Sequence, residues 1–217
     1  MITHLLFDLD NTLYSSRYGL ENNVSQRIND FIVEVMGLPR PEVEEIRKEV
    51  AQNHKYGTTL EWLMAEKGFS DIEAYYGAIN AGNDYDSLPP DPELDDFLAT
   101  IPLPKAVLTN SCIEHAERVL AKLGIRGRFS HVFDIRFNNY KGKPRKEVYL
   151  RALEAMGAKP ESCLFVDDYT KFVDGYLALG GKALLMDEFD QRPNYPHPRI
   201  KNIQEIEKYI SIEDISG

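Results

Sequence analysis

The sequence predicts an α/β fold in which a Rossmann-like parallel sheet forms the core and a helical cap domain is inserted. Three observations predict this fold. Short apolar runs of the kind found in buried parallel strands recur along the chain, and helical patterns separate most of them. Nearly a hundred residues separate Asp10, after the first run, from Thr109, after the second, which is far more than a strand-to-helix connection needs. At 217 residues, the chain is also long enough to bury such a core.

Apolar runs and helical patterns define the expected elements. Five runs have the character of buried strands: residues 5–9, 105–108, 132–135, 163–166 and 183–186. Among the helices, residues 113–123 carry apolar positions on one face and stop at Gly124, and residues 147–156 stop at Gly157. Asp91 before a proline is typical of a capped helix start. This alternation predicts a parallel sheet with helices on both faces.

The long interval between the first two strands is predicted to be an inserted helical domain. Apolar residues recur at helical spacing over residues 24–35 and again over 43–50. A Leu-Pro-Pro sequence closes the interval, as expected of a domain boundary. We therefore expect a core domain made of residues 1–16 and 86–217 and a cap domain made of residues 17–85.

Charge and composition narrow the range of partners. The net charge of −10 argues against nucleic acid, because binding a polyanion needs clustered Lys and Arg. No apolar run is long enough to cross a bilayer, so we expect no membrane partner. Cys112 and Cys163 lie far apart in the sequence, which favours packing roles in a reducing compartment. We therefore expect a cytoplasmic protein, either a monomer or a homodimer.

Two carboxylates follow the first strand. Residues two apart in a strand point to the same side, so Asp8 and Asp10 should face one site at the carboxyl end of the sheet, where such sheets bind ligands. The chemistry that suits them is covalent: Asp8 attacks phosphorus to form an aspartyl phosphate, while Asp10 protonates the leaving oxygen and later deprotonates water. A polar turn without chemistry is the alternative interpretation.

A second carboxylate pair, Asp167 and Asp168, closes the run at residues 163–166. In a parallel sheet this pair would share the edge on which Asp8 lies. Hard oxygen ligands from two strand ends indicate a Mg²⁺ site. The alternative is that these residues cap the helix that begins near Thr170.

Two further segments could serve a phosphate group. Thr109, Asn110 and Ser111 begin the helix at residues 113–123, where free amides and the helix dipole favour an anion. We expect Thr109 to donate its hydroxyl to a phosphoryl oxygen and Ser111 to cap the helix. Lys143 lies in a loop fixed by Gly and Pro and could offset charge during phosphoryl transfer. A solvated surface lysine is the alternative.

Taken together, these segments resemble the four motifs of the haloacid dehalogenase (HAD) superfamily, and the resemblance covers nearly the whole chain. Residues 7–14, Phe-Asp-Leu-Asp-Asn-Thr-Leu-Tyr, look like the first motif, with its nucleophilic and acid/base aspartates. Thr109 looks like the second motif, Lys143 followed by Pro144 looks like the third, and the Asp-Asp pair at 167–168 looks like the fourth.

The resemblance implies a HAD-like core with Mg²⁺ as cofactor. By that resemblance Asp8, the backbone carbonyl of Asp10, and Asp168 would hold the metal, with Asp167 assisting. One departure is Phe172, which stands where many relatives carry Asp or Asn. Supporting hydrogen bonds around the metal are therefore in question, although Asp168 itself is not.

A finer resemblance points to the pyrimidine 5′-nucleotidase-like branch, in which a helical cap lies between motifs one and two. Residues 11–14, residues 56–60 and Thr-Asn-Ser at 109–111 followed by His115 carry it. The implied substrate is a pyrimidine nucleoside 5′-monophosphate. Candidate substrate contacts are Asn110, Ser111, Tyr14 and Arg17, with Tyr18, Tyr56 and Trp62 as further candidates, although Trp62 fits the cap core better. His115 is expected to be a surface helix residue.

Other functions remain open at this point. A dehalogenase has no need for a leaving-group acid, yet Asp10 is present. A sugar phosphomutase uses the same four motifs and would release an isomer instead of phosphate. A non-catalytic module that binds a phospho-ligand would be expected to lack Asp8, Asp10 or Lys143, and none is missing. The sequence thus favours a Mg²⁺-dependent phosphatase that acts on a small phosphorylated metabolite.

Overall fold

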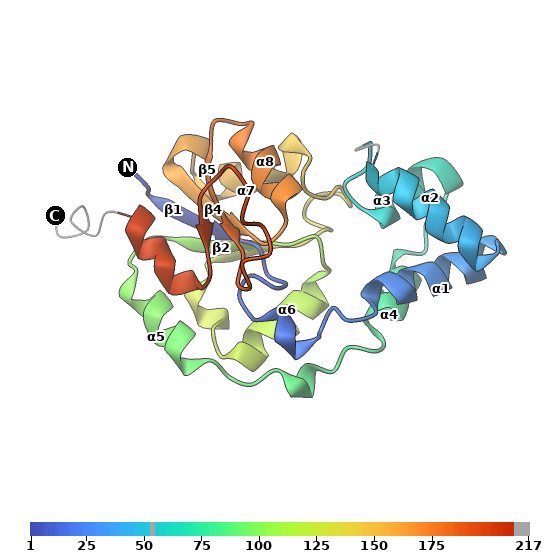
Figure 1. Ribbon diagram of the computed structural model, residues 1–217, viewed down its shortest axis with the longest axis horizontal. Helices are drawn as coiled ribbons and strands as arrows, with labels where there is room; N and C mark the ends of the chain where they lie inside the picture. The colour runs from blue at the N-terminus through green and yellow to red at the C-terminus, as the bar shows by residue number, and fades with distance from the viewer. Residues whose placement is uncertain (53–54, 211–217) are drawn as a thin grey trace.

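A parallel sheet lies at the centre of the molecule (Figure 1). The computed structural model describes residues 1–52 and 55–210, and within them six parallel strands lie in the order β3-β2-β1-β4-β5-β6. The strands are β1 (His4–Phe7), β2 (Lys105–Leu108), β3 (His131–Phe133), β4 (Cys163–Asp167), β5 (Lys182–Met186) and β6 (Arg199–Ile200). β1 lies between β2 and β4, with Phe7 in register with Val107 and Val166. The predicted α/β fold with a Rossmann-like parallel sheet is confirmed.

Each of the five predicted strands overlaps an observed one, with small differences at the ends. β1 ends at Phe7 because the chain turns directly afterwards, where the amides of Thr12 and Leu13 both donate to the Leu9 carbonyl. The sequence did not predict β6, because this strand has two residues and follows a proline-rich segment without an apolar run.

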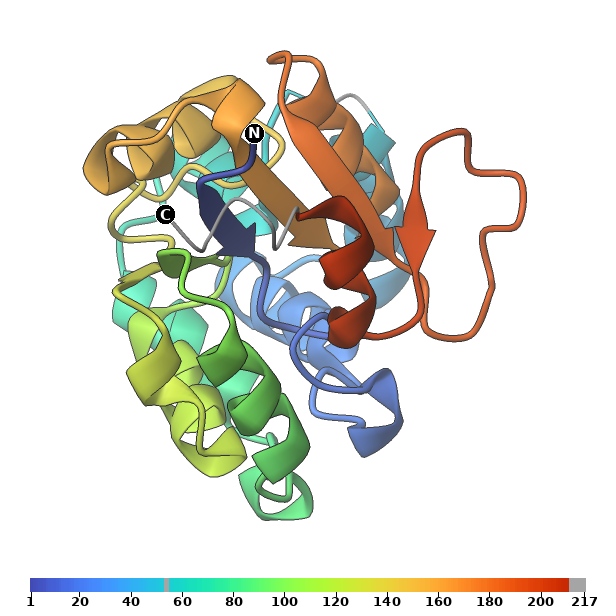
Figure 2. The same cartoon turned by 90° about the vertical axis from the view of Figure 1, so that its left-hand side faces the viewer.

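Helices cover both faces of the sheet (Figure 2). One face packs against α5 (Pro92–Thr100), α6 (Ile113–Leu123) and the 3₁₀ segment η5 (Ile203–Tyr209), and the other packs against α7 (Lys146–Met156) and α8 (Thr170–Leu177). Alternate residues of β1 enter the two cores, as expected of a strand that is buried on both faces. Short 3₁₀ turns complete this region: η1 (Ser16–Tyr18), η2 (Tyr85–Ser87), η3 (Arg126–Arg128) and η4 (Pro160–Ser162).

The helix ends follow the local chemistry of the sequence. The Asp91 side chain accepts a hydrogen bond from the amide of Leu94 at 2.9 Å, which caps α5 as predicted. α6 spans its predicted range and ends at Gly124, whose φ of 78° lies in the left-handed region. α7 begins at Lys146, one residue before the prediction.

Between β1 and β2, the described residues form four further helices, which lie at one end of the sheet (Figure 1): α1 (Val24–Met36), α2 (Arg40–Gln52), α3 (Thr59–Lys67) and α4 (Ile72–Asn80). Their apolar side chains form a cluster of their own, and Trp62 is buried in it, as expected. Cys112 and Ile135 from the sheet region also join this cluster. The division into a core and a cap at residues 17 and 85 stays a prediction.

In the described part of the chain, no helix is both long and apolar enough to cross a bilayer.

Candidate active site

The carboxyl ends of β1, β2 and β4 bring the predicted residues together at one edge of the sheet. Asp8 directly follows β1, and its amide donates to the Val166 carbonyl of β4 at 2.8 Å. Thr109 directly follows β2. Asp167 is the last residue of β4. This convergence is a consequence of parallel strands that lie in register.

Asp10 reaches the site by a different route from the one predicted. The sequence interpretation placed Asp8 and Asp10 two apart in one strand, but β1 has ended before either residue. Asp10 lies in the turn after β1, next to Asn11, whose φ of 56° is a left-handed conformation that asparagine tolerates. The two carboxylates therefore share a site because of this turn, and not because of strand alternation.

Lys143 is at the centre of the site and is fully buried, with 0% of its surface exposed. Its Nζ lies 2.6 Å from Oδ1 of Asp8 and 2.6 Å from Oδ2 of Asp167. Burial opposes a charged lysine, but the two carboxylates raise the pKa of Lys143. Its Nζ also lies 5.0 Å from the centroid of the Phe172 ring. The surface-lysine alternative for Lys143 is therefore wrong, and Phe172 packs against this lysine.

Three carboxylates could hold a cation. Ligand oxygens of Asp8, Asp167 and Asp168 lie within 4.8 Å of one another. Burial raises the pKa of Asp8, and the negative charge of Asp10 adds to this effect against the pull of Lys143. Burial also raises the pKa of Asp168, to about 7, with the charge of Asp8 as the next cause. Clustered acidic oxygens whose charges repel one another fit a hard divalent cation such as Mg²⁺.

The two members of the second carboxylate pair have different surroundings. Asp167 is completely buried; its Oδ2 binds Lys143 and its Oδ1 accepts from the amide of Tyr169 at 2.8 Å. Among the described contacts, Asp167 thus binds the residue that precedes α8 and no amide of the helix itself, so the capping alternative is wrong for this residue. Asp168 is only partly buried and lines the pocket, so it is better placed than Asp167 to bind a metal ion.

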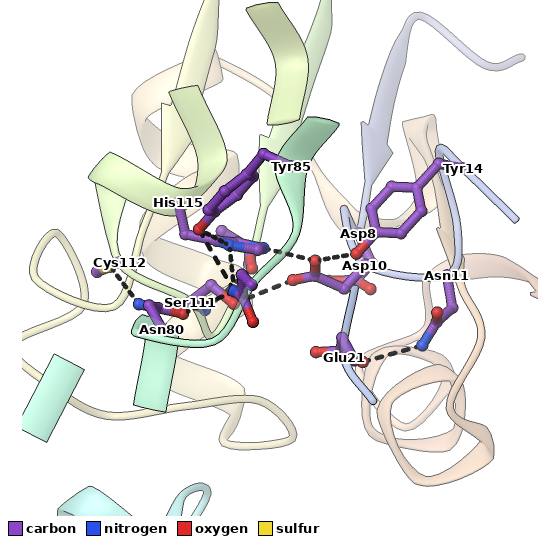
Figure 3. Close-up of polar contacts among 12 residues, drawn as sticks. Asp8, Asp10, Asn11, Tyr14, Glu21, Asn80, Tyr85, Ser111, Cys112 and His115 are labelled. Carbon is purple, nitrogen blue, oxygen red and sulfur yellow. Dashed lines mark hydrogen bonds and ion pairs between the residues drawn. The ribbon is translucent and has the colours of Figure 1, made fainter. Parts of the chain in front are cut away.

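Asp10 accepts three side-chain hydrogen bonds (Figure 3). Its Oδ1 accepts from the Tyr14 hydroxyl at 2.6 Å and lies 2.7 Å from Nε2 of His115, and its Oδ2 accepts from the Ser111 hydroxyl at 3.0 Å. Burial alone would raise the pKa of Asp10, but the charge of His115 and these hydrogen bonds lower it. The same pairing raises the pKa of His115 in spite of its burial.

The structure corrects the expected place of His115, which is 4% exposed and therefore not a surface residue. Its helix face turns toward Asp10 because apolar residues of α6 on either side, such as Val119, pack into the core. Tyr14 was predicted to contact substrate. In the structure it is buried and its hydroxyl is engaged by Asp10.

The segment before α6 holds the phosphate candidates in place. Asn110 Oδ1 accepts from the Lys143 amide at 2.8 Å, and Thr109 Oγ1 accepts from the Ser111 amide at 3.0 Å. Ser111 was expected to cap α6, and this is wrong, since its hydroxyl binds Asp10. The amide of Ile113 is instead capped by Asp134, whose Oδ2 accepts at 3.1 Å.

Two adjoining pockets open beside these residues. The first encloses about 230 Å³ and is lined by Asp8, Asp10, Thr109, Lys143 and Asp168, together with Asn110 and Ser111. The second encloses about 190 Å³ between α1, α3, α4 and the start of α6. Its walls combine apolar side chains with carboxamides. The apolar side chains include Val24, Ile28, Leu60 and Tyr76, and the carboxamides include Asn80 and Asn83.

Glu21 lines both pockets, and sequence reasoning missed it because it lies outside the four motifs. Its Oε2 accepts from Nδ2 of Asn11 at 2.9 Å. Partial desolvation by the surrounding protein and the nearby carboxylates, Asp10 and then Asp8, raise the pKa of Glu21, although its side chain is exposed to solvent. Arg17 lines neither pocket in the described part of the chain; it is exposed, with its guanidinium 4.7 Å from the centroid of the Phe189 ring.

A curated relative, Phosphate metabolism protein 8 of Saccharomyces cerevisiae, is 25% identical over 193 residues, which are 80% of this chain and 58% of the relative. The chain therefore spans less than two thirds of the length of that relative.

Solved structures of three hydrolases share the fold. L-2-haloacid dehalogenase from Xanthobacter autotrophicus is 18% identical with a TM-score of 0.61, and the match covers 96% of this chain and 98% of that one. A HAD phosphatase from Thermococcus onnurineus is 17% identical with a TM-score of 0.60, covering 97% and 98%. A HAD-type hydrolase of Bacillus subtilis, YfnB, solved with magnesium, is 18% identical with a TM-score of 0.61, covering 97% and 99%.

The family model described as haloacid dehalogenase-like hydrolase matches residues 2–170, which include the carboxylates, Lys143 and the inserted helices. The chain therefore belongs to the haloacid dehalogenase-like hydrolases.

Proposed function

We propose that this hydrolase is a Mg²⁺-dependent phosphatase that cleaves a small phosphate monoester through an aspartyl phosphate on Asp8. One observation carries the proposal: Asp8 and Asp10 line a single pocket with Lys143 and Asp168. A nucleophile, an acid/base, a counter-charge and a metal ligand are the groups that this reaction needs.

The residues divide the chemistry into two steps. An oxygen of Asp8 attacks phosphorus, the bond from phosphorus to the leaving oxygen breaks, and that oxygen takes a proton from Asp10. Water then attacks the phosphorus of the aspartyl phosphate and gives its proton to Asp10, which frees phosphate and restores the Asp8 carboxylate. The hydrogen bonds to Asp10 in the free protein favour its carboxylate form, the form that the second step requires. The proton that the second step leaves on Asp10 is the one that the leaving oxygen takes in the next turnover.

Charge is balanced by Lys143 and by the cation. Lys143 holds the Asp8 carboxylate in place and offsets the negative charge that approaches it. Mg²⁺, when bound by Asp8 and Asp168, would draw charge from the phosphoryl oxygens. Thr109 lines the pocket, where its hydroxyl can meet a phosphoryl oxygen.

The presence and fixation of Asp10 favour a phosphatase over a dehalogenase. Halide leaves without a proton, so a dehalogenase gains nothing from a buried carboxylate held by three donors. A sugar phosphomutase would use the same residues, and its product would be an isomer of the substrate. A phospho-ligand-binding module without turnover has no need for the paired Asp8 and Asp10.

The second pocket supports a leaving group with both apolar and polar faces. Its apolar walls suit a flat ring, and the carboxamides of Asn80 and Asn83 can exchange hydrogen bonds with a polar edge. A pyrimidine nucleoside 5′-monophosphate combines these features, and we propose it as the substrate.

Phosphate release from 4-nitrophenyl phosphate, with and without Mg²⁺, tests the reaction. We expect Asp8→Asn to abolish release, because a carboxamide cannot attack phosphorus. Asp86→Asn, which changes an exposed carboxylate outside the site, should leave the rate unchanged. Equal activity in Asp8→Asn and the parent would show that the proposal is wrong.

A panel of nucleotides, sugar phosphates and phospho-acids tests the substrate. We expect UMP and CMP to give the highest kcat/KM. No preference for them would remove the nucleotide assignment and leave the phosphatase assignment in place, whereas an isomerised sugar phosphate without free phosphate would indicate a mutase.

A further inference from the structure

His115 joins Asp10 to the segment by which the chain leaves the inserted helices (Figure 3). Its Nε2 lies 2.7 Å from Oδ1 of Asp10, and its Nδ1 lies 2.9 Å from the hydroxyl of Tyr85. Tyr85 begins the 3₁₀ turn η2, which follows α4. The guanidinium of Arg118 lies 4.1 Å from the centroid of the Tyr85 ring and packs over it. Tyr85 therefore fixes the His115 ring through Nδ1, and this leaves Nε2 directed at Asp10.

The hydrogen bonds to Asp10 are unevenly shared between its two oxygens. Oδ1 faces both the Tyr14 hydroxyl, at 2.6 Å, and His115, while Oδ2 accepts only from Ser111, at 3.0 Å, among the described contacts. A carboxylate oxygen has about two acceptor positions, so Oδ1 is fully occupied and Oδ2 has one left. Both Asp10 and Ser111 line the pocket that also holds Asp8.

We infer that His115 is a positioning residue for proton transfer: together with Tyr14 it fixes Oδ1 of Asp10, so that Oδ2 exchanges the proton. The inference rests on the proposed phosphatase function. In the first step the Oδ2 proton moves to the leaving oxygen as its bond to phosphorus breaks, and in the second step the attacking water returns a proton to Oδ2. His115 keeps its Nε2 proton throughout.

The test uses leaving groups that differ in their need for an acid. Nitrophenolate is a stable anion and departs without a proton, whereas the oxygen of an alkyl phosphate must be protonated as it leaves. His115→Leu should therefore lower kcat/KM by about 30-fold or more for an alkyl phosphate, and by less than about fivefold for 4-nitrophenyl phosphate, given that acid catalysis contributes about 10²- to 10⁴-fold. His115 also lines the second pocket, so the alkyl phosphate is chosen too small to fill it, and KM for this substrate should stay within about twofold.

A conservative variant and a control separate positioning from folding. His115→Gln keeps an N–H near the position of Nε2, and we expect it to recover most of the alkyl phosphate activity. His131→Gln changes an exposed histidine at the start of β3 and should have no effect. In the Asp10→Asn background, His115→Leu should cause no further loss, because both changes remove the same proton transfer.

Equal losses for both substrates, or a further loss in the Asp10→Asn background, would mean that His115 only stabilises the fold, and would overturn the inference. If His115→Leu does not fold, Tyr85→Phe replaces it. That variant removes the hydrogen-bond partner of Nδ1, and its loss of kcat/KM should also be larger for the alkyl phosphate than for 4-nitrophenyl phosphate, although both losses should be smaller than in His115→Leu. Equal losses for the two substrates in Tyr85→Phe would also overturn the inference. A parent protein without phosphate release would instead overturn the proposed function.

Discussion

Lys143 shows how strongly one residue can link stability to chemistry. It is fully buried between Asp8 and Asp167. Removing one partner of a buried ion pair leaves charge uncompensated and costs about 3–5 kcal/mol. Lys143→Met keeps the length of the side chain and removes its charge. We expect it to lower the free energy of unfolding by about that amount at pH 8 without metal, and to lower phosphate release by about 100-fold or more.

The loss of stability in Lys143→Met should depend on pH. Burial already raises the pKa of Asp8 and of Asp167, and without Lys143 both pKa values rise further. The folded state then holds protons that the unfolded state releases, so stability falls as pH rises, and the loss shrinks toward pH 5. Urea unfolding at pH 5 and pH 8 measures this. Lys141→Met, whose lysine is exposed, should change stability by less than about 0.5 kcal/mol. A loss that is the same at both pH values would contradict the argument.

The sequence predicted the site residues that directly follow strands, but it did not predict the residues that hold those site residues in place by hydrogen bonds. Asp8, Thr109 and Asp168 could be placed because the carboxyl ends of parallel strands meet at one edge. His115 could not, because helical spacing gives a face and not the partner that this face meets. Its contact with Asp10 depends on the turn after β1 and on the packing of α6, which are tertiary features.

At the scale of elements, a close backbone contact joins the inserted helices to the loop that carries Lys143. A Cβ on Gly57, just before α3, would clash with the carbonyl oxygen of Gly142. Nearby, Nη2 of Arg145 lies 2.6 Å from Oε1 of Glu61, which is in α3. Any residue larger than glycine at position 57 must therefore push these two segments apart.

Gly57→Ala should consequently disturb both stability and substrate binding. We expect a loss of about 1–3 kcal/mol from overpacking and a rise in KM of severalfold, since residues 58–60 line the second pocket. Thermal unfolding and steady-state kinetics measure the two effects. Gly77→Ala is the matched control: a Cβ there meets nothing within 4 Å, and α4 should gain up to about 1 kcal/mol. Identical behaviour of the two variants would contradict the proposed contact.

Element boundaries were predictable where a local signal exists. Gly124 and the Asp91 cap fixed helix ends correctly, because a left-handed residue and a capping side chain act within one turn. The prediction that Ser111 caps α6 was wrong. Its spacing to Glu114 fits a capping box, but in the folded chain its hydroxyl donates to Asp10 instead. β6 is held by the neighbouring β5 and has no signal of its own.

For the whole molecule, alternating strands and helices were enough to predict the sheet, because parallel connections need a crossover helix. How the inserted helices meet the sheet edge was not predictable from periodicity, since that meeting depends on single contacts such as Gly57 with Gly142. The proposed leaving-group pocket is formed by that meeting, which is why its lining residues were largely missed.

The concentration of carboxylates at this edge makes the stability of the metal-free molecule depend on pH. The pKa of Asp168 is raised to about 7, well above its unfolded value, so the folded state binds an extra proton between about pH 4 and pH 7. Stability should therefore fall as pH rises through this range. The opposite shift of Asp10, whose pKa is lowered, acts at more acidic pH and does not cancel the effect above pH 5.

Magnesium should reverse this loss, because it replaces the proton as the charge that Asp8 and Asp168 share. We expect the Tm in EDTA to be lower at pH 8 than at pH 5.5, and millimolar Mg²⁺ to raise it more at pH 8, where protons no longer compete. Asp168→Asn should raise the Tm in EDTA at pH 8 and remove most of the Mg²⁺ response, whereas Asp86→Asn should leave both unchanged. A Mg²⁺ response of equal size at both pH values, or one that survives in Asp168→Asn, would mean that the cation binds elsewhere.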